Sequence, residues 1–165
     1  VRVGQPSDLP AMMAFLRDAH AENGMAPIAE DRVEPVLQCA LAQWRGIVGI
    51  VDAPDGKIAG AVGLLVGKWW YSHEEHLEDI FTFVREDYRH MKMARPLLDF
   101  AKRAARELEM PLLMGVLSTD RTQAKVRLFE RKLPMAGALF LYRPDGAEPP
   151  HAAPKAAALK ESAHG

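Results

Sequence analysis

The sequence predicts a single mixed α/β domain, and three observations support that prediction. The chain has 165 residues, about the size of one domain, of which 48% are apolar and 26% are charged. Its apolar residues recur at helical spacing in some segments and at strand-like spacing in others. These segments follow one another in the order β-α-α-β-β-β-α-β-α-β, without an internal repeat. Such an order is typical of one sheet with helices packed on its faces.

Composition and charge narrow the classes of partner. The chain carries 21 basic and 22 acidic residues, whereas a protein that binds polyanions is usually more basic, so nucleic acid is not expected as the main partner. Cys39 is the only cysteine, which excludes an internal disulfide and favours a reducing compartment. No apolar run approaches the ~20 residues of a membrane span, and no signal peptide opens the chain. We therefore expect a cytoplasmic protein without a membrane partner. Because the sequence does not begin with Met, we also expect that the chain was trimmed or processed. The oligomeric state is open, with a homodimer as one option.

The N-terminal half predicts a short strand, two helices and a hairpin. "VRVGQ" alternates like a strand, and the helix that follows ends at Gly24, a residue that favours helix termination. A second amphipathic helix is expected from Asp31 to Trp44. The β-rich runs "GIVGIVDA" and "KIAGAVGLLVG" flank the turn residues "PDG", which predicts a hairpin.

The C-terminal half predicts three strands and two helices. "LEDIFTFV" is an expected strand, and a helix follows from Arg95 to Leu108. "LLMGVLS" is the next strand, so the β-α-β unit from Ile80 to Ser118 should be a right-handed parallel crossover. "TDRTQAKVRLFERK" predicts a helix capped by Thr119 or Asp120, and "AGALFLYR" predicts a last strand. We expect a domain over residues 1–143 and an Ala- and Pro-rich tail, at most a short helix, over residues 144–165.

The stretch "EDYRHMKMARPLLDF" places a basic turn directly before a helix. The first N–H groups of a helix are unpaired, and its dipole adds roughly half a positive charge there, so a phosphate group fits such a site. Here the turn also carries Arg89, His90, Lys92 and Arg95. The residues alone leave two interpretations open, a pyrophosphate site and a solvated basic helix start.

This region resembles the GNAT superfamily of acetyl-CoA-dependent N-acetyltransferases. In the family motif a strand ends in an apolar residue, and Gln or Arg follows five positions later. Two residues, Gly, one residue, and Gly or Ala come next. Val84 ends the strand here, Arg89 occupies the Gln/Arg position and Ala94 the last small position, while Lys92 stands where the first glycine is usual.

A second motif and the element order extend the likeness. "VRLFERKLPMAGALFLY" resembles the family's Leu-Tyr-Glu-Lys-Leu-Gly-Phe ending and last strand, and the resemblance covers roughly Val1 to Tyr142. It implies a GNAT fold, a mixed central β-sheet of about six to seven strands flanked by helices. A narrower likeness is to the small acetyltransferases encoded in phages and prophages.

The resemblance also implies how acetyl-CoA would bind. Strand backbone groups would pair with the pantetheine arm, from Thr82, Phe83 and Val84. The pyrophosphate would rest beside Arg89 on N–H groups of the turn, those of His90, Met91, Lys92, Met93, Ala94 and Arg95. Lys92 fits this arrangement unless its position needs a positive φ, which costs a non-glycine residue roughly 1 kcal/mol. Its ammonium group is an alternative direct contact to phosphate.

Transfer to an amine needs a base that removes the amine's proton. Glu78 is the candidate, because it lies at the strand position where some GNAT enzymes carry a basic glutamate. By the two-residue period of a strand, we expect Glu78, Ile80, Thr82 and Val84 to share one face, and Asp79, the second candidate, to point to the other. A solvated carboxylate at the strand start is the alternative for Glu78.

The proton donor to the CoA thiolate is less clear in the sequence. The family commonly uses a tyrosine at the position of Phe129, which cannot donate a proton. Tyr142 is the substitute that we assign, and Tyr88 and Ser118 are alternatives. A non-catalytic acyl-CoA-binding module is therefore the rival to an N-acetyltransferase. The sequence does not identify the acceptor, which is a small molecule or a protein. The likeness to phage acetyltransferases adds modified DNA bases and host proteins as candidate acceptors.

The segment "SHEEHLED" carries two histidines and four carboxylates within eight residues. These residues could bind a metal ion, but their spacing does not match the H-E-x-x-H zinc pattern. We favour a polar rim of the acceptor site that attracts a cationic amine, and we expect no metal. The preceding "WWY" residues either line that site or cover the core.

Overall fold

The computed structural model describes residues 1–118, 122–142 and 144. The chain divides into two compact units. The first comprises Val1–Ala21 and Ile28–Gly115, and the second comprises Glu22–Pro27 and Val116–Gly165. The sequence predicted that the domain ends at residue 143 and that a tail follows over residues 144–165. Because residues 143 and 145–165 lie outside the described residues, this boundary and the tail stay predictions. No helix of the described residues is long and apolar enough to cross a membrane.

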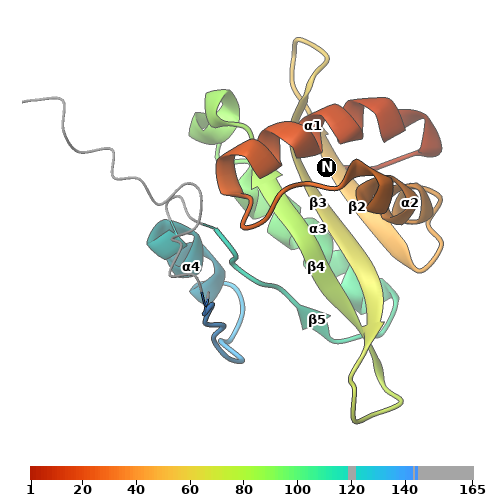
Figure 1. Ribbon diagram of the computed structural model, residues 1–165, viewed down its shortest axis with the longest axis vertical. Helices are drawn as coiled ribbons and strands as arrows, with labels where there is room; N and C mark the ends of the chain where they lie inside the picture. The colour runs from red at the N-terminus through yellow and green to blue at the C-terminus, as the bar shows by residue number, and fades with distance from the viewer. Residues whose placement is uncertain (119–121, 143, 145–165) are drawn as a thin grey trace, which may run out of the picture. The chain divides into compact units, whose positions relative to one another are not determined.

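The first unit is built on one five-stranded sheet in the order β1-β2-β3-β4-β5 (Figure 1). Strands β1 to β4 pair antiparallel, and β4 pairs parallel with β5. The mixed α/β architecture is confirmed, but six to seven strands were expected and the described residues form five. The strands are β1 Arg2–Val3, β2 Gly46–Asp52, β3 Ile58–Lys68, β4 Glu75–Val84 and β5 Leu112–Leu113.

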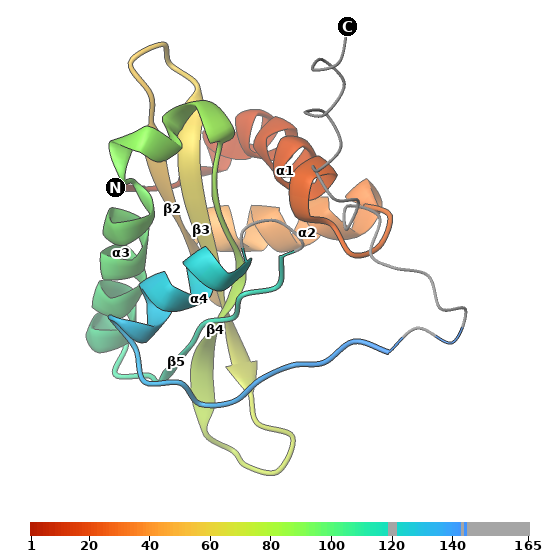
Figure 2. The ribbon, with the colours of Figure 1, turned by 90° about the vertical axis from the view of Figure 1, so that its left-hand side faces the viewer.

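Helices cover both faces of this sheet (Figure 2). The 3₁₀ helix η1 (Pro6–Asp8), α1 (Leu9–Asn23) and α2 (Glu30–Leu41) precede β2, and α3 (Ala94–Glu107) joins β4 to β5. We call the sheet face under α1 and α2 the α1/α2 face, and the face under α3 the α3 face. The core of the α1/α2 face includes Met12, Phe15, Leu37 and Ile50. The core of the α3 face includes Val62, Leu64, Leu77, Leu97 and Phe100.

The predicted second helix ends three residues early. It was expected to continue to Trp44, but α2 ends at Leu41. Gln43 and Arg45 follow with φ angles of 56° and 51°, in the left-handed region that no right-handed helix contains. The chain therefore leaves the helix there, and Trp44 is exposed.

The parallel pairing of the β4-α3-β5 unit is confirmed, but β5 is shorter than expected. Leu77 pairs with Leu112 and Glu78 with Leu113. The expected strand over residues 112–118 stops after those two pairs. Beyond Glu78, no strand of the described residues pairs with the outer edge of β4, the edge that faces away from β3.

A β-bulge at Ile80 changes the side-chain alternation of β4. Asp79 pairs with Leu64 and Phe81 with the adjacent Gly63, so Ile80 has no partner on β3. As a result Glu78 lies opposite Leu65 on the α1/α2 face, whereas Asp79 and Thr82 lie opposite Leu64 and Val62 on the α3 face. The expectation that Glu78, Ile80, Thr82 and Val84 share one face is therefore wrong, because it assumed a strand without a bulge.

The second unit contains α4 (Thr122–Glu130), which confirms the helix expected around these residues. Its expected caps, Thr119 and Asp120, lie outside the described residues. The last strand, expected over residues 136–143, is not formed over residues 136–142. Leu139, Phe140 and Leu141 are exposed, with Phe140 95% accessible to solvent. An apolar run predicts a strand only where another strand supplies hydrogen-bond partners, and none of the described residues does so here.

Candidate active site

The segment between β4 and α3 forms a strand-turn-helix connection. Residues Glu86–Met91 form a 3₁₀ helix, η2, and Lys92 ends it with φ 53° and ψ 32°, in the left-handed region. The α3 helix then begins at Ala94, and no side chain caps its N-terminus at Met93. The first N–H groups of this 14-residue helix therefore have no side-chain partner from the cap position. This geometry is that of an anion site at a helix start.

Lys92 adopts the conformation that favours glycine. The resemblance placed a glycine at this position, and the φ of 53° shows why a glycine is suited to it. The lysine reaches the same backbone conformation at a cost of about 1–2 kcal/mol. Its N–H lies 3.3 Å from the carbonyl oxygen of Arg89, so this donor is already engaged within the turn. His90 and Met91 belong to η2, and a 3₁₀ helix characteristically engages its N–H groups with carbonyl oxygens three residues earlier.

Arg89 fastens the end of β4 to this turn. Its Nε donates to the carbonyl oxygen of Val84 at 3.2 Å, and its guanidinium lies 5.8 Å from the ring centroid of Phe83. Phe83 is buried and packs edge-on against Phe15 of α1. The arginine thus links the strand end and the turn to the buried layer beneath them.

The β2–β3 turn supports the same segment from the other side. The Tyr88 hydroxyl donates to Asp55 at 2.9 Å. Two donors, the N–H of Lys57 first and the Tyr88 hydroxyl second, hold the pKa of Asp55 below its usual value, and the same bond raises the pKa of Tyr88. Met93 is buried with Ala53 and Ala59 of this turn and its flanking strand. The start of α3 is therefore held by packing as well as by hydrogen bonds.

Asp79 lies enclosed at the bulge of β4. Its carboxylate accepts hydrogen bonds from the Thr82 hydroxyl at 3.0 Å and from the backbone N–H groups of Gly115 and Phe81. Burial raises the pKa of Asp79 to about 7, and these hydrogen bonds only partly oppose that effect. Asp79 thus connects β4 to the chain that leaves β5, next to the unpaired outer edge of β4.

Glu78 lies on the opposite face and is more accessible. Its side chain is 47% exposed, and its Oε2 lies 3.9 Å from Nε2 of His76. The sequence had offered His76 as a metal ligand or as part of a polar rim, and its contact with Glu78 was not foreseen. The signal that pointed to it is Gly67, since a glycine inside a strand often marks a close approach.

The other predicted residues are not all brought together. Thr82 contacts Asp79, and Val84 packs into the core of the α3 face. Arg95 lies on the first turn of α3, 3.8 Å from Asp99. Tyr142, the assigned proton donor, belongs to the second unit and is 85% exposed. Ser118, also in that unit, donates to Asn23 and lies 2.5 Å from the Lys125 ammonium group.

The metal interpretation finds no geometric support in the part of the chain that the structure describes. No three His, Cys, Asp or Glu side chains of residues 1–118 and 122–142 converge as metal ligands. The carboxylate of Glu75, at the start of β4, instead binds Arg45 at 2.9 Å and lies 3.7 Å from Lys68.

The mixed sheet and this strand-turn-helix connection agree with the GNAT resemblance of the sequence. Residues 12–133 match the model of the Acetyltransferase (GNAT) family, which is well over half of the chain, and the protein belongs to that family. No curated protein sequence matches the chain.

Solved structures share the fold at low sequence identity. An aminoglycoside 6'-N-acetyltransferase from Acinetobacter baumannii is 10% identical, with a TM-score of 0.64 over 86% of this chain and 95% of that one. A ribosomal-protein-alanine N-acetyltransferase from Brucella melitensis biovar Abortus 2308 is 14% identical, with a TM-score of 0.62 over 86% and 96%. An aminoglycoside acetyltransferase from an uncultured soil metagenomic sample, in complex with trehalose, is 17% identical, with a TM-score of 0.59 over 86% and 91%. These structures show the shared fold, and the family match identifies the protein as a member of an acetyltransferase family.

Proposed function

We propose that the protein transfers an acetyl group from acetyl-CoA to a primary amine of a small molecule or a protein. The observation that carries this proposal is the outer edge of β4, which pairs with no strand of the described residues beyond Glu78 and leads through η2 into the uncapped start of α3. An unpaired strand edge offers backbone donors and acceptors to an extended ligand. A helix start offers N–H groups to a phosphate. Acetyl-CoA carries both kinds of group in this order, because its extended pantetheine arm is followed by a pyrophosphate.

The residues of the chain fit such a ligand. Thr82, Phe83 and Val84 would face the pantetheine amides with their backbone groups, as the resemblance implied. The N–H groups of Met93, Ala94 and Arg95 lie where the pyrophosphate would rest, while those of His90, Met91 and Lys92 shape the turn beneath it. The side chains of Arg89, Lys92 and Arg95 add positive charge on the same short segment.

The chemistry requires a neutral amine. In our proposal the Glu78 carboxylate takes one proton from the attacking amine. The amine nitrogen forms a bond to the thioester carbonyl carbon, and the carbon–sulfur bond then breaks. The CoA thiolate leaves, with a thiol pKa of about 8.5 for a comparable cysteine. Tyr142 is our candidate for returning a proton to that thiolate, since Phe129 cannot do so.

The acceptor class is inferred from two kinds of support. Carboxylates near the start of β4, among them Glu78, favour a cationic amine by electrostatic attraction. The similar structures include acetyltransferases of aminoglycosides and of a ribosomal-protein alanine, so they support a small molecule and a protein equally. The alternative function is a catalytically inactive acyl-CoA-binding module, and Phe129 is the residue that favours it.

Calorimetry and a thiol-release assay test the proposal. The protein should bind acetyl-CoA and release thiol with at least one member of a panel of polyamines, amino acids, amino sugars and peptide N-termini. Glu78→Gln should lower turnover by about 10²–10⁴-fold without loss of acetyl-CoA binding. Glu75→Gln, three residues earlier on β4, is the control and should keep most of the activity. Binding without thiol release for any amine would favour the inactive module, and unchanged turnover in Glu78→Gln would remove Glu78 as the base.

A further inference from the structure

His76 is a buried histidine whose environment is unusual for a purely structural residue. It is 4% exposed, and its Nδ1 is fully buried with no hydrogen-bond partner among the described residues. Leaving a buried polar atom unpaired costs about 1–3 kcal/mol. An apolar side chain of similar size would fill this position without that cost. The imidazole therefore calls for a reason beyond packing.

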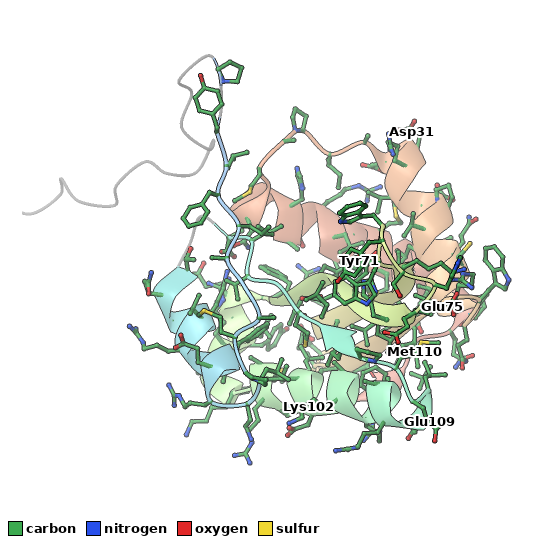
Figure 3. All side chains as sticks on the ribbon, turned by 90° about the horizontal axis from the view of Figure 1, so that it is seen from below. Asp31, Tyr71, Glu75, Lys102, Glu109 and Met110 are labelled. Carbon is green, nitrogen blue, oxygen red and sulfur yellow. The ribbon has the colours of Figure 1, made fainter. Side chains whose placement is uncertain are left out.

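Aromatic stacking holds the imidazole ring of His76 in one orientation. Trp69, at the end of β3, stacks on His76 with ring centroids 4.3 Å apart and planes 27° apart. Tyr71 in turn stacks on Trp69 at 6.0 Å. Figure 3 looks at the molecule from below and labels Tyr71, which lies in the β3–β4 connection, and Glu75, the first residue of β4. The loop aromatics thus form a cover over the imidazole.

The space beneath His76 depends on a missing side chain. Gly67 of β3 pairs with His76 of β4. A Cβ atom at Gly67 would lie 3.1 Å from Nε2 of His76 and 3.1 Å from Cδ and Oε1 of Glu78. Those distances are tighter than ordinary van der Waals contacts, so a side chain at this position would require His76 or Glu78 to shift by a few tenths of an ångström. Gly67 therefore lets His76 and Glu78 lie together over the β3 backbone.

The other charges near His76 are already paired or exposed. Lys68 of β3 and Arg45, which follows α2, both contact Glu75. His73 and Glu74 of the loop are exposed. Glu78 is the carboxylate that faces the imidazole, with Oε2 3.9 Å from Nε2. One side of Glu78 thus meets His76, while about half of its side chain is open to solvent.

We propose that His76 is a positioning residue for Glu78 and receives the proton that Glu78 removes from the acceptor amine. This role rests on the proposed function. The N–H bond of the amine breaks and an O–H bond forms on Glu78. That O–H bond then breaks as an N–H bond forms on Nε2 of His76. The glutamate returns to its charged form, and the imidazolium later releases its proton to water.

A double-mutant cycle tests this role, because residues that act through one another have non-additive effects. His76→Phe keeps the stacking on Trp69 and removes both ring nitrogens. It should lower kcat at least 10-fold and leave KM for acetyl-CoA unchanged. Adding His76→Phe to Glu78→Gln should lower kcat by less than a further twofold. Gly67→Ala, whose Cβ would crowd both side chains, should also lower kcat, and circular dichroism should confirm that each variant is folded.

A second measurement does not depend on activity. In ¹⁵N-histidine-labelled protein, Glu78→Gln should shift the imidazole signals of His76, whereas Glu75→Gln should leave them nearly unchanged. Equal shifts in both variants, or multiplicative effects of the two substitutions on kcat, would overturn the proposed role of His76. A wild-type protein that releases no thiol with any amine would overturn the proposed function instead, and would do so even if the His76 signals respond to Glu78.

Discussion

Asp79→Asn should change the pH dependence of folding stability. Burial raises the pKa of Asp79 from 3.8 to about 7, so the folded protein holds this proton more tightly than the unfolded chain does. The stability that the proton contributes is complete below pH ~4 and is lost as the pH rises toward 7. A pKa difference of about three units corresponds to roughly 4 kcal/mol of folding stability, which is an upper bound. Because Asp79 is not fully buried, we expect its proton to contribute about 2–4 kcal/mol. Asparagine cannot ionise and removes this loss.

The substitution therefore has opposite effects at the two ends of the range. At pH 8 the variant should be more stable than the wild type by about 1–3 kcal/mol, after subtracting roughly 1 kcal/mol for a weakened hydrogen bond. At pH 4.5 it should be equal or slightly less stable. Urea unfolding at both pH values measures the difference. Asp55→Asn is the control of opposite sign, since the pKa of Asp55 is lowered by its hydrogen bonds. A difference between Asp79→Asn and wild type that stays constant from pH 4.5 to 8 would refute the reasoning.

Two further predictions concern backbone and packing. Lys92→Gly should raise the free energy of unfolding by up to about 1 kcal/mol, because glycine accepts the φ of 53° without strain; Lys92→Ala keeps the strain, and an equal gain in that variant would contradict the explanation. Gly49→Ala should cost about 1–3 kcal/mol in urea unfolding, because its Cβ would lie 2.6 Å from a ring carbon of Phe100. Gly137→Ala, with nothing within 4 Å, is the control and should have little effect.

Periodicity in the sequence was sufficient for most of the fold. The helices α1 and α3 and the β2–β3 hairpin lie within a few residues of their expected places, because each carries its own apolar pattern and its own turn residues. The expected strand over residues 136–143 failed for the opposite reason. A strand depends on a neighbour elsewhere in the chain, and an apolar run does not reveal whether that neighbour exists.

The site was predicted in part for a related reason. The turn around Lys92 could be located, because a helix start and its basic residues are local features. The face that Glu78 and Asp79 each occupy could not, because the bulge at Ile80 arises from the pairing of β4 with β3. The contact between Glu78 and His76 depends on Gly67, which lies nine residues before His76 on the neighbouring strand. This contact can be seen only once the register of the two strands is known.

The left-handed backbone at Lys92 also bears on how such proteins are found by sequence. The groups proposed to hold the pyrophosphate are main-chain atoms, so selection on this loop acts on its dihedral angles and only indirectly on residue identity. A search pattern that demands glycine at the first small position would miss this chain. A pattern that accepts any residue able to reach φ near +50°, followed by an alanine and an uncapped helix, would retain it.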